Sequence, residues 1–143
     1  MFALLVLASV GTLTPFGFLG CKKNETPRCG RCGMMIEPQS AFRAELNMTD
    51  TGGTQAFDTV KCALKHRATR KVRTTLRVQE YYSRAWVDGD SVRYVIGSDV
   101  LGPMGKDIIP VAEPQVAKFN HDHGGDKTLK LAEIDEPTLN AVP

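Results

Sequence analysis

Apolar and polar side chains alternate along residues 42–48, and this alternation constrains the fold more than any other feature of the sequence. The apolar side chains are Phe42, Ala44, Leu46 and Met48, and the polar ones are Arg43, Glu45 and Asn47. Such alternation is typical of a strand with one buried face. The segment Asp50–Gly53 favours a hairpin turn, so we predict that Thr54–Phe57 is the returning strand.

A helix and a third strand follow this hairpin. Asp58 is a good N-cap, and the pattern predicts a helix from there to about Arg70. Residues 76–82 have the composition of a strand. The first half of the chain therefore has the order strand, strand, helix, strand.

The second half repeats this order. The predicted elements are a hairpin of residues 85–87 and 91–96 around Asp88-Gly89, a loop over 97–110, a helix opened by Glu113-Pro114 and ended by Gly124-Gly125, a strand over 127–134, and a disordered tail from Asp135. Two small ββαβ units with antiparallel sheets define an α+β fold.

The first twenty residues carry no charge and contain an apolar run over residues 2–8, which is typical of a secretory signal peptide. Phe18-Leu19-Gly20-Cys21 resembles a bacterial lipobox, in which the signal is cut before a cysteine that then carries lipid. A plain transmembrane anchor is the alternative, but proline and several glycines make a poor helix there. We expect a protein that is exported, lipid-anchored to the membrane and facing the periplasm or the cell exterior.

This interpretation divides the chain into a signal peptide (1–20), a lipidated cysteine with a tether (21–28), one domain (29–135) and a tail (136–143). Within the domain, the first ββαβ unit covers 29–83 and the second 84–135. The net charge of +2 is too small to indicate a nucleic-acid partner. Residues 61–77 are rich in lysine and arginine without an acid, so they form either a docking surface for anionic lipid or an acidic partner, or simply a solvated face.

Lipidation of Cys21 leaves three cysteines, an odd number for an oxidising compartment. The simplest arrangement is one disulfide and one free thiol. We predict a disulfide between Cys29 and Cys62 that leaves Cys32 for a metal, although the sequence alone leaves the pairing open.

Cys32-Gly33-Met34 places a thiolate and a thioether two residues apart. These soft donors suit copper(I) in particular. Residues i and i+2 of a strand lie about 6.6 Å apart, so the segment must bend to place both on one ion, and Gly33 permits the bend. The alternative is a small buried cysteine and a methionine that fills a core gap.

Other side chains bear on this site. Arg28 and Arg31 should favour the thiolate form of Cys32. Met104, between a Gly-Pro pair and Gly105, is a further candidate ligand. His123 ends a helix, where it is either a ligand or a partner of the terminal carbonyls.

Two other kinds of protein fit parts of the pattern. Cys29, Cys32, Cys62 and His66 have the spacing of a structural Cys3His zinc site in an exported binding module. Cys29-Gly-Arg-Cys32 could instead belong to a thiol–disulfide oxidoreductase, but Gly33 and Pro38 make the required helix after it unfavourable.

Several pieces in order resemble the NosL family of exported copper-binding lipoproteins, which help nitrous oxide reductase to mature. The pieces are the lipobox at Cys21, Cys29-Gly-Arg-Cys32-Gly33-Met34, Phe57–Leu64, Ala85-Trp86-Val87, Val95–Ser98, Pro103-Met104-Gly105 and Phe119–Gly125. Together they extend over roughly residues 21–135. The order and spacing of these pieces make the resemblance fairly specific.

The resemblance implies a metallochaperone rather than an enzyme. Such a protein binds one copper(I) outside the cytoplasmic membrane and hands it toward nitrous oxide reductase, beside a membrane ABC-type complex. By the same resemblance, Cys32 and Met34 are the primary ligands and Met104 or His123 completes the site, with Met35 as an alternative thioether. The family also resembles the fold of organomercurial lyase, with paired ββαβ units.

Overall fold

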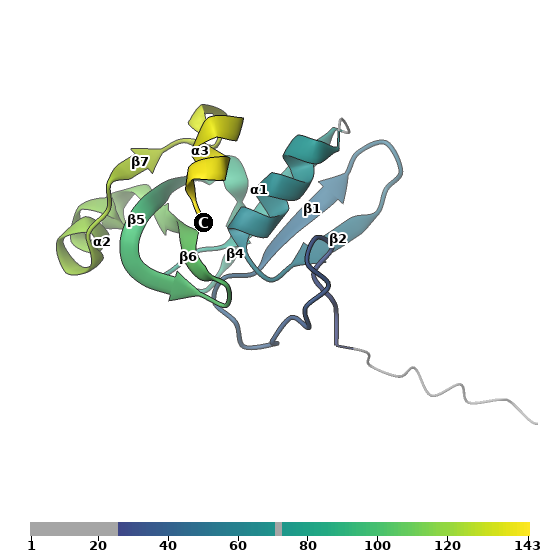
Figure 1. Cartoon of the computed structure of the whole chain (residues 1–143), viewed down its shortest axis with the longest axis horizontal. Coiled ribbons are helices and arrows are strands. Elements are labelled where there is room, and N and C mark those ends of the chain that lie inside the picture. The colour runs from purple at the N-terminus through teal and green to yellow at the C-terminus, as the bar shows by residue number, and fades with distance from the viewer. Residues whose placement is uncertain (1–25, 71–72) are drawn as a thin grey trace, which may run out of the picture.

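The computed structural model describes residues 26–70 and 73–143, which form two antiparallel sheets with helices packed on them (Figure 1). The first sheet has the order β2-β1-β3-β4, and the second has the order β6-β5-β7. The strands are β1 (Ala44–Met48), β2 (Thr54–Phe57), β3 (Thr74–Gln79), β4 (Trp86–Asp88), β5 (Val92–Gly102), β6 (Gly105–Ala112) and β7 (Lys127–Leu129). The predicted α+β fold is confirmed.

Each sheet contains one ββαβ unit. Helix α1 (Val60–Thr69) connects β2 to β3, and helix α2 (Val116–His123) connects β6 to β7. In both units the first strand lies between the second and the third. The remaining helical segments are η1 (Gly89–Ser91), η2 (Glu113–Gln115), η3 (Leu131–Glu133) and α3 (Glu136–Ala141). The two predicted units therefore share one topology.

The prediction was wrong for the second hairpin. Strand β4 pairs with β3 of the first sheet, and Asp88 caps the 3₁₀ turn η1 instead of opening a hairpin turn. The hairpin of the second unit is formed by β5 and β6, which occupy most of the predicted loop 97–110. Glycines in this loop suggested irregular backbone, but here they accommodate a register shift in β5 and a tight turn at Gly105, where φ is +90°.

The predicted last strand and disordered tail also differ from the structure. Strand β7 ends at Leu129, and a 3₁₀ turn follows it. Asp135 then caps α3, where its side chain accepts the backbone N–H of Thr138. Leu139 and Val142 are buried. The tail is ordered because it supplies apolar side chains to the main core.

Both faces of the second sheet are buried, because successive residues of its strands point alternately into two different cores. Tyr94 and Ile108 belong to the core that α1 shares with the first sheet. Val95 and Ile109, their neighbours in sequence, belong to a smaller core under α2, centred on Phe119. Helix α1 thus packs between the two sheets, and its N-terminus is held in a fixed place.

No helix in residues 26–70 and 73–143 is long and apolar enough to cross a bilayer. The predicted signal peptide and the predicted lipidation site Cys21 lie outside the described residues and stay predictions.

Candidate metal site

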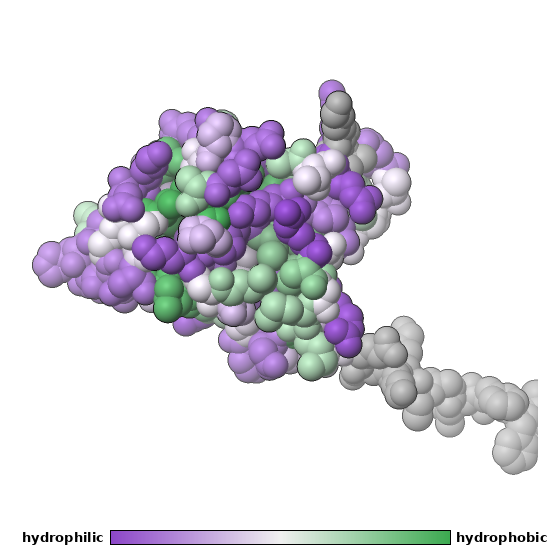
Figure 2. Space-filling model, in the orientation of Figure 1, coloured by the Kyte–Doolittle hydropathy of each residue, from purple (hydrophilic) through white to green (hydrophobic). Residues whose placement is uncertain are grey.

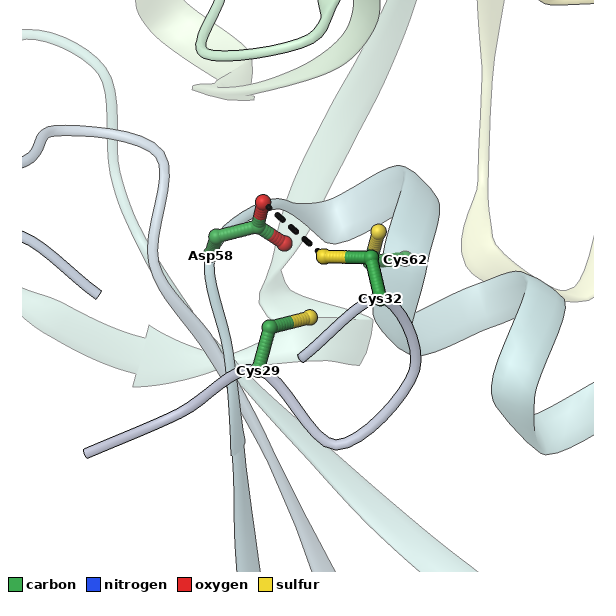
Figure 3. A group of neighbouring side chains, drawn as sticks. All are labelled: Cys29, Cys32, Asp58 and Cys62. Atoms are coloured by element: carbon green, nitrogen blue, oxygen red, sulfur yellow. Dashed lines mark hydrogen bonds between the residues drawn. The ribbon is translucent and has the colours of Figure 1, made fainter. Parts of the chain in front are cut away.

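Three cysteines and one aspartate converge at the N-terminus of α1. One potential ligand atom from each of Cys29, Cys32, Asp58 and Cys62 lies within 4.8 Å of the others. The four side chains point toward a common space (Figure 3). Three of these residues are buried and Cys32 is exposed, so the group opens to solvent on the side of Cys32.

A tight turn brings the first two cysteines together. The backbone N–H of Gly33 donates to Cys29 O at 2.9 Å, and that of Cys29 donates to Met34 O at 2.8 Å. Gly33 has a φ of +76°, which disfavours a side chain. A further bond from Gly30 N to Ala56 O, at 2.9 Å, fixes the turn on the end of β2. The bend predicted at Gly33 is present.

The other two residues belong to the start of α1. Thr59, not the predicted Asp58, is the N-cap, and its hydroxyl accepts the backbone N–H of Cys62 at 3.1 Å. Asp58 is therefore free to turn its side chain toward Cys32, whose thiol donates to Asp58 Oδ2 at 3.6 Å. Asp58 Oδ1 is buried and has no hydrogen-bond partner within the described residues. An unpartnered buried carboxylate oxygen is suited to a cation.

Sequence reasoning missed Asp58 as a candidate ligand. Asp58 and Thr59 are both good N-caps, and only one of two adjacent residues can take that position. A signal was therefore available, because the residue that does not cap the helix has its side chain free for another contact. Which residue would cap was decided by the tertiary structure.

The three cysteines differ in how readily they ionise. The neighbouring Cys62 thiol and the backbone amides of Cys32 and Asp58 lower the pKa of Cys29 to about 6 despite its burial. The proximity of Cys29, together with burial, raises the pKa of Cys62. Cys29 is thus the thiol of the three that ionises most readily.

The prediction that Cys32 is the easily ionised thiol was wrong. Partial burial of its sulfur and the neighbouring Cys29 and Asp58 raise the pKa of Cys32. The guanidinium of Arg28 donates to Gly33 O at 3.0 Å, next to Cys32, and yet the pKa of Cys32 is raised. The sequence placed arginines near Cys32 along the chain, but the fold places negative groups near it in space.

Met104 lies beside the same group. The β5–β6 turn brings it to a pocket of about 230 Å³ that Cys32 and Cys62 also line. Its side chain is 47% exposed. The structure thus places Met104, a predicted metal ligand, beside Cys32 and Cys62, although Met104 lies far from both cysteines in the sequence.

The two methionines of the cysteine loop are placed differently. The backbone amide of Met34 hydrogen-bonds to the Cys32 sulfur, and its side chain is 41% exposed. Coordination by the Met34 thioether stays a prediction. Met35 lines a separate hollow with Thr26, Pro27 and Arg28.

His123 is not part of the cysteine group. Its ring packs on Phe119, its Nε2 lies 3.3 Å from the Tyr81 hydroxyl, and its Nδ1 lies 3.1 Å from Asp99. These contacts place His123 in the small core under α2 rather than at the start of α1. The structure therefore does not bring this predicted ligand to the other three.

The structure also bears on the two alternatives, the Cys3His zinc site and the redox Cys-x-x-Cys pair. The ring of His66 packs at a tilt against Phe57, with ring centroids 5.1 Å apart, and His66 is not in the cysteine group, where Asp58 takes the fourth position instead. No helix begins directly after Cys32, as expected from Gly33. A Cys3Asp set thus takes the place of the alternative Cys3His set, and the usual setting of a redox Cys-x-x-Cys pair is not present in the described chain.

The three described cysteines are free thiols in this structure. No covalent bond joins Cys29 to Cys62. The predicted Cys29–Cys62 disulfide stays a prediction for the oxidised protein.

The fold and the site together define a small α+β protein of paired ββαβ units with a cysteine-rich potential metal site. Among known proteins, the NosL family model matches residues 21–139. The chain belongs to the NosL family, as its motifs suggested.

Two solved structures have a similar fold. The copper chaperone NosL from Shewanella denitrificans superposes with a TM-score of 0.66 at 20% identity, over 78% of this chain and 92% of that one. The apo-NosL protein from Achromobacter cycloclastes gives a TM-score of 0.53 at 20% identity, over 67% of this chain and 87% of that one. None of the curated proteins matches this sequence.

Proposed function

We propose that this protein is an exported, lipid-anchored copper(I) carrier and not an enzyme. The convergence of Cys29, Cys32 and Cys62 at the N-terminus of α1 supports this function most strongly. Thiolates and thioethers select soft cations. Met104, which lines the same pocket, adds a thioether.

The arrangement also suits release of the metal. Cys32 is exposed while Cys29 and Cys62 are buried, so an incoming ligand approaches copper from one side. A closed four-coordinate cage holds its ion, whereas a site with an open position permits exchange. The family and the fold likeness to a copper chaperone favour the same role. We propose that copper passes to nitrous oxide reductase through an ABC-type maturation complex in the membrane.

Zinc is the second candidate because Asp58 completes a four-donor set. Three thiolates and one carboxylate oxygen are all ligands that zinc accepts in tetrahedral sites. A structural zinc site would leave Met104 without a role. Metal analysis after refolding with both copper(I) and zinc distinguishes the two candidates, since Met104→Leu weakens a copper(I) site and leaves a zinc site unchanged.

The deciding experiment is a competition titration of reduced protein with bicinchoninate, which measures copper(I) affinity. We expect Cys29→Ser and Cys32→Ser to weaken binding by orders of magnitude, because each removes a thiolate ligand. Met34→Leu and Met104→Leu should weaken it less. Met35→Leu is the matched control, since Met35 lines a different hollow. Wild-type affinity in Cys32→Ser would rule out the proposed site.

A further inference from the structure

Three cationic side chains line the pocket beside Cys32. Arg31 extends from the cysteine loop, and Lys61 and Lys65 extend from α1, all lining this pocket. Within the described residues, none of the three forms an ion pair with an aspartate or a glutamate. The pocket that holds the soft ligands therefore has a positively charged lining.

Main-chain oxygens hold the two lysines in place, and the peptide carbonyl that binds Lys65 leaves the charge of that ammonium unpaired. The Lys61 ammonium donates to Lys106 O at 2.6 Å and also to Pro143 O, and the Lys65 ammonium donates to Val142 O at 2.9 Å. Burial and then the charges of Lys61 and Arg31 lower the pKa of Lys65. The three cations are thus close enough to repel one another.

Two nearby acids make no ion pair with these cations. Asp107 is directed to the backbone N–H groups of Lys61 and Ile108. Glu136 lines a neighbouring hollow with Arg31 and Lys65 but makes no ion pair with them. Figure 2 shows the result on this face, where hydrophilic side chains cover α1 and a pale green, weakly hydrophobic area lies directly beside it.

The positively charged lining of the pocket favours copper(I) that arrives as part of an anionic complex over copper(I) that arrives as a free cation. It repels a free cation and attracts an anion, and such focusing raises association rates by about 10- to 1000-fold. The pocket of about 230 Å³ is smaller than the roughly 300–1,000 Å³ of drug-sized sites. Its size and charge suit a small anionic complex better than a lobe of another protein.

We propose that the chain takes copper from small anionic copper(I) complexes, such as copper(I) thiolates, which Arg31 and Lys65 draw to Cys32. This inference rests on the proposed copper(I) function and adds the chemical class of the donor. In the transfer step, the Cys32 sulfur bonds to copper and a donor thiolate leaves with its electron pair. The proton of Cys32 passes to the departing thiolate or to water. Copper remains copper(I), so the exchange needs no oxidant or reductant.

The test compares two copper(I) donors that share one chelating unit but differ in charge. Copper(I) bathocuproine disulfonate is an anion, and copper(I) neocuproine is a cation. Stopped-flow absorbance measures the rate at which reduced full-length protein removes copper from each donor at low salt. We expect Arg31→Gln/Lys65→Gln to slow transfer from the anionic donor by about tenfold and to leave transfer from the cationic donor unchanged or faster. Added salt should remove the difference.

Lys118→Gln/Lys127→Gln is the matched control, because it removes two positive charges from α2 and β7. It should leave both rates unchanged. Copper(I) glutathione, a natural kind of anionic thiolate donor, should behave like the disulfonate complex.

Three results would contradict the inference. Equal slowing with both donors would mean that the two cations support the site structurally, and unchanged rates would mean that they do not guide the donor. Slowing with the disulfonate but not with glutathione would instead favour an acidic protein partner. If the wild type binds no copper(I) from either donor in an equilibrium titration, the proposed function itself fails, so the two failures are distinguishable.

Discussion

At the scale of single residues, the sulfur chemistry depends on the proximity of two buried cysteines. The Cys62 thiol stabilises the Cys29 thiolate, so the pKa of Cys29 is lowered to about 6 and that of Cys62 is raised. A thiol stabilised as thiolate is a ready ligand, because a metal displaces a proton from any thiol that still carries one. Cys29 and Cys62 are similarly buried, but copper must displace a proton from the Cys62 thiol more often than from Cys29.

Removing the Cys62 thiol should change the titration of Cys29. We expect Cys62→Ala to raise the pKa of Cys29 from about 6 toward its ordinary value near 9, so that fewer molecules carry the thiolate between these pH values. The ultraviolet absorbance of thiolate in reduced, metal-free protein measures the change. Cys32→Ala is the control, because Cys32 supports the Cys29 thiolate through its backbone amide, which the substitution keeps. Equal midpoints in the two variants would contradict the assigned cause.

At the scale of elements, the N-terminus of α1 connects the site to the fold. The cap at Thr59 fixes the first turn that carries Cys62, and Asp58 precedes that turn. The positive end of the helix macrodipole also faces the cluster, which favours negative sulfur and carboxylate there. A weaker cap should therefore affect both stability and metal binding.

Thr59→Ala tests this connection. We expect the variant to lose about 0.5–2 kcal/mol of unfolding free energy, because the buried N–H of Cys62 loses its acceptor. Copper(I) affinity should fall as well, because the first turn no longer fixes Cys62. Urea unfolding and the bicinchoninate competition measure the two effects. Thr59→Ser keeps the hydroxyl and should retain most of both properties, whereas equal losses in the two variants would assign the effect to packing of the threonine methyl group.

At the scale of the whole molecule, α1 lies between two sheets and the C-terminal segment closes the core beside it. Leu139 and Val142 pack into the same core as Leu64 and Phe57. The main-chain oxygens of Pro143 and Val142 also accept hydrogen bonds from Lys61 and Lys65, the two lysines of the metal pocket. The segment that the sequence predicted to be disordered is thus a structural part of the domain.

Shortening the buried side chain of α3 should destabilise the entire domain. We expect Leu139→Ala to lower the unfolding free energy by about 2–5 kcal/mol, because it leaves a cavity in the main core. Asn140→Ala, an exposed neighbour on the same helix, should change it little. Urea unfolding followed by circular dichroism measures both variants. Equal stability in the two would show that α3 is not part of the cooperative core.

Local patterns determined a large part of this fold. The alternation over residues 42–48 predicted β1, and the turn residues that follow predicted its hairpin with β2. Both depend on contacts between near neighbours, which a sequence displays directly. The order of the first ββαβ unit and the bend at Gly33 were determined in the same way.

Contacts between distant residues were decided only by the tertiary structure. Strand β4 could pair with either sheet by its own pattern, and in the folded chain it pairs with β3. Met104 reaches the cysteines and His123 does not, because the β5–β6 turn lies over α1 while α2 lies on the other face of the second sheet. The sequence alone determined which soft ligands the chain possesses. Their selection into one site required the fold, because metal ligands act through distances in space and not through spacing along the chain.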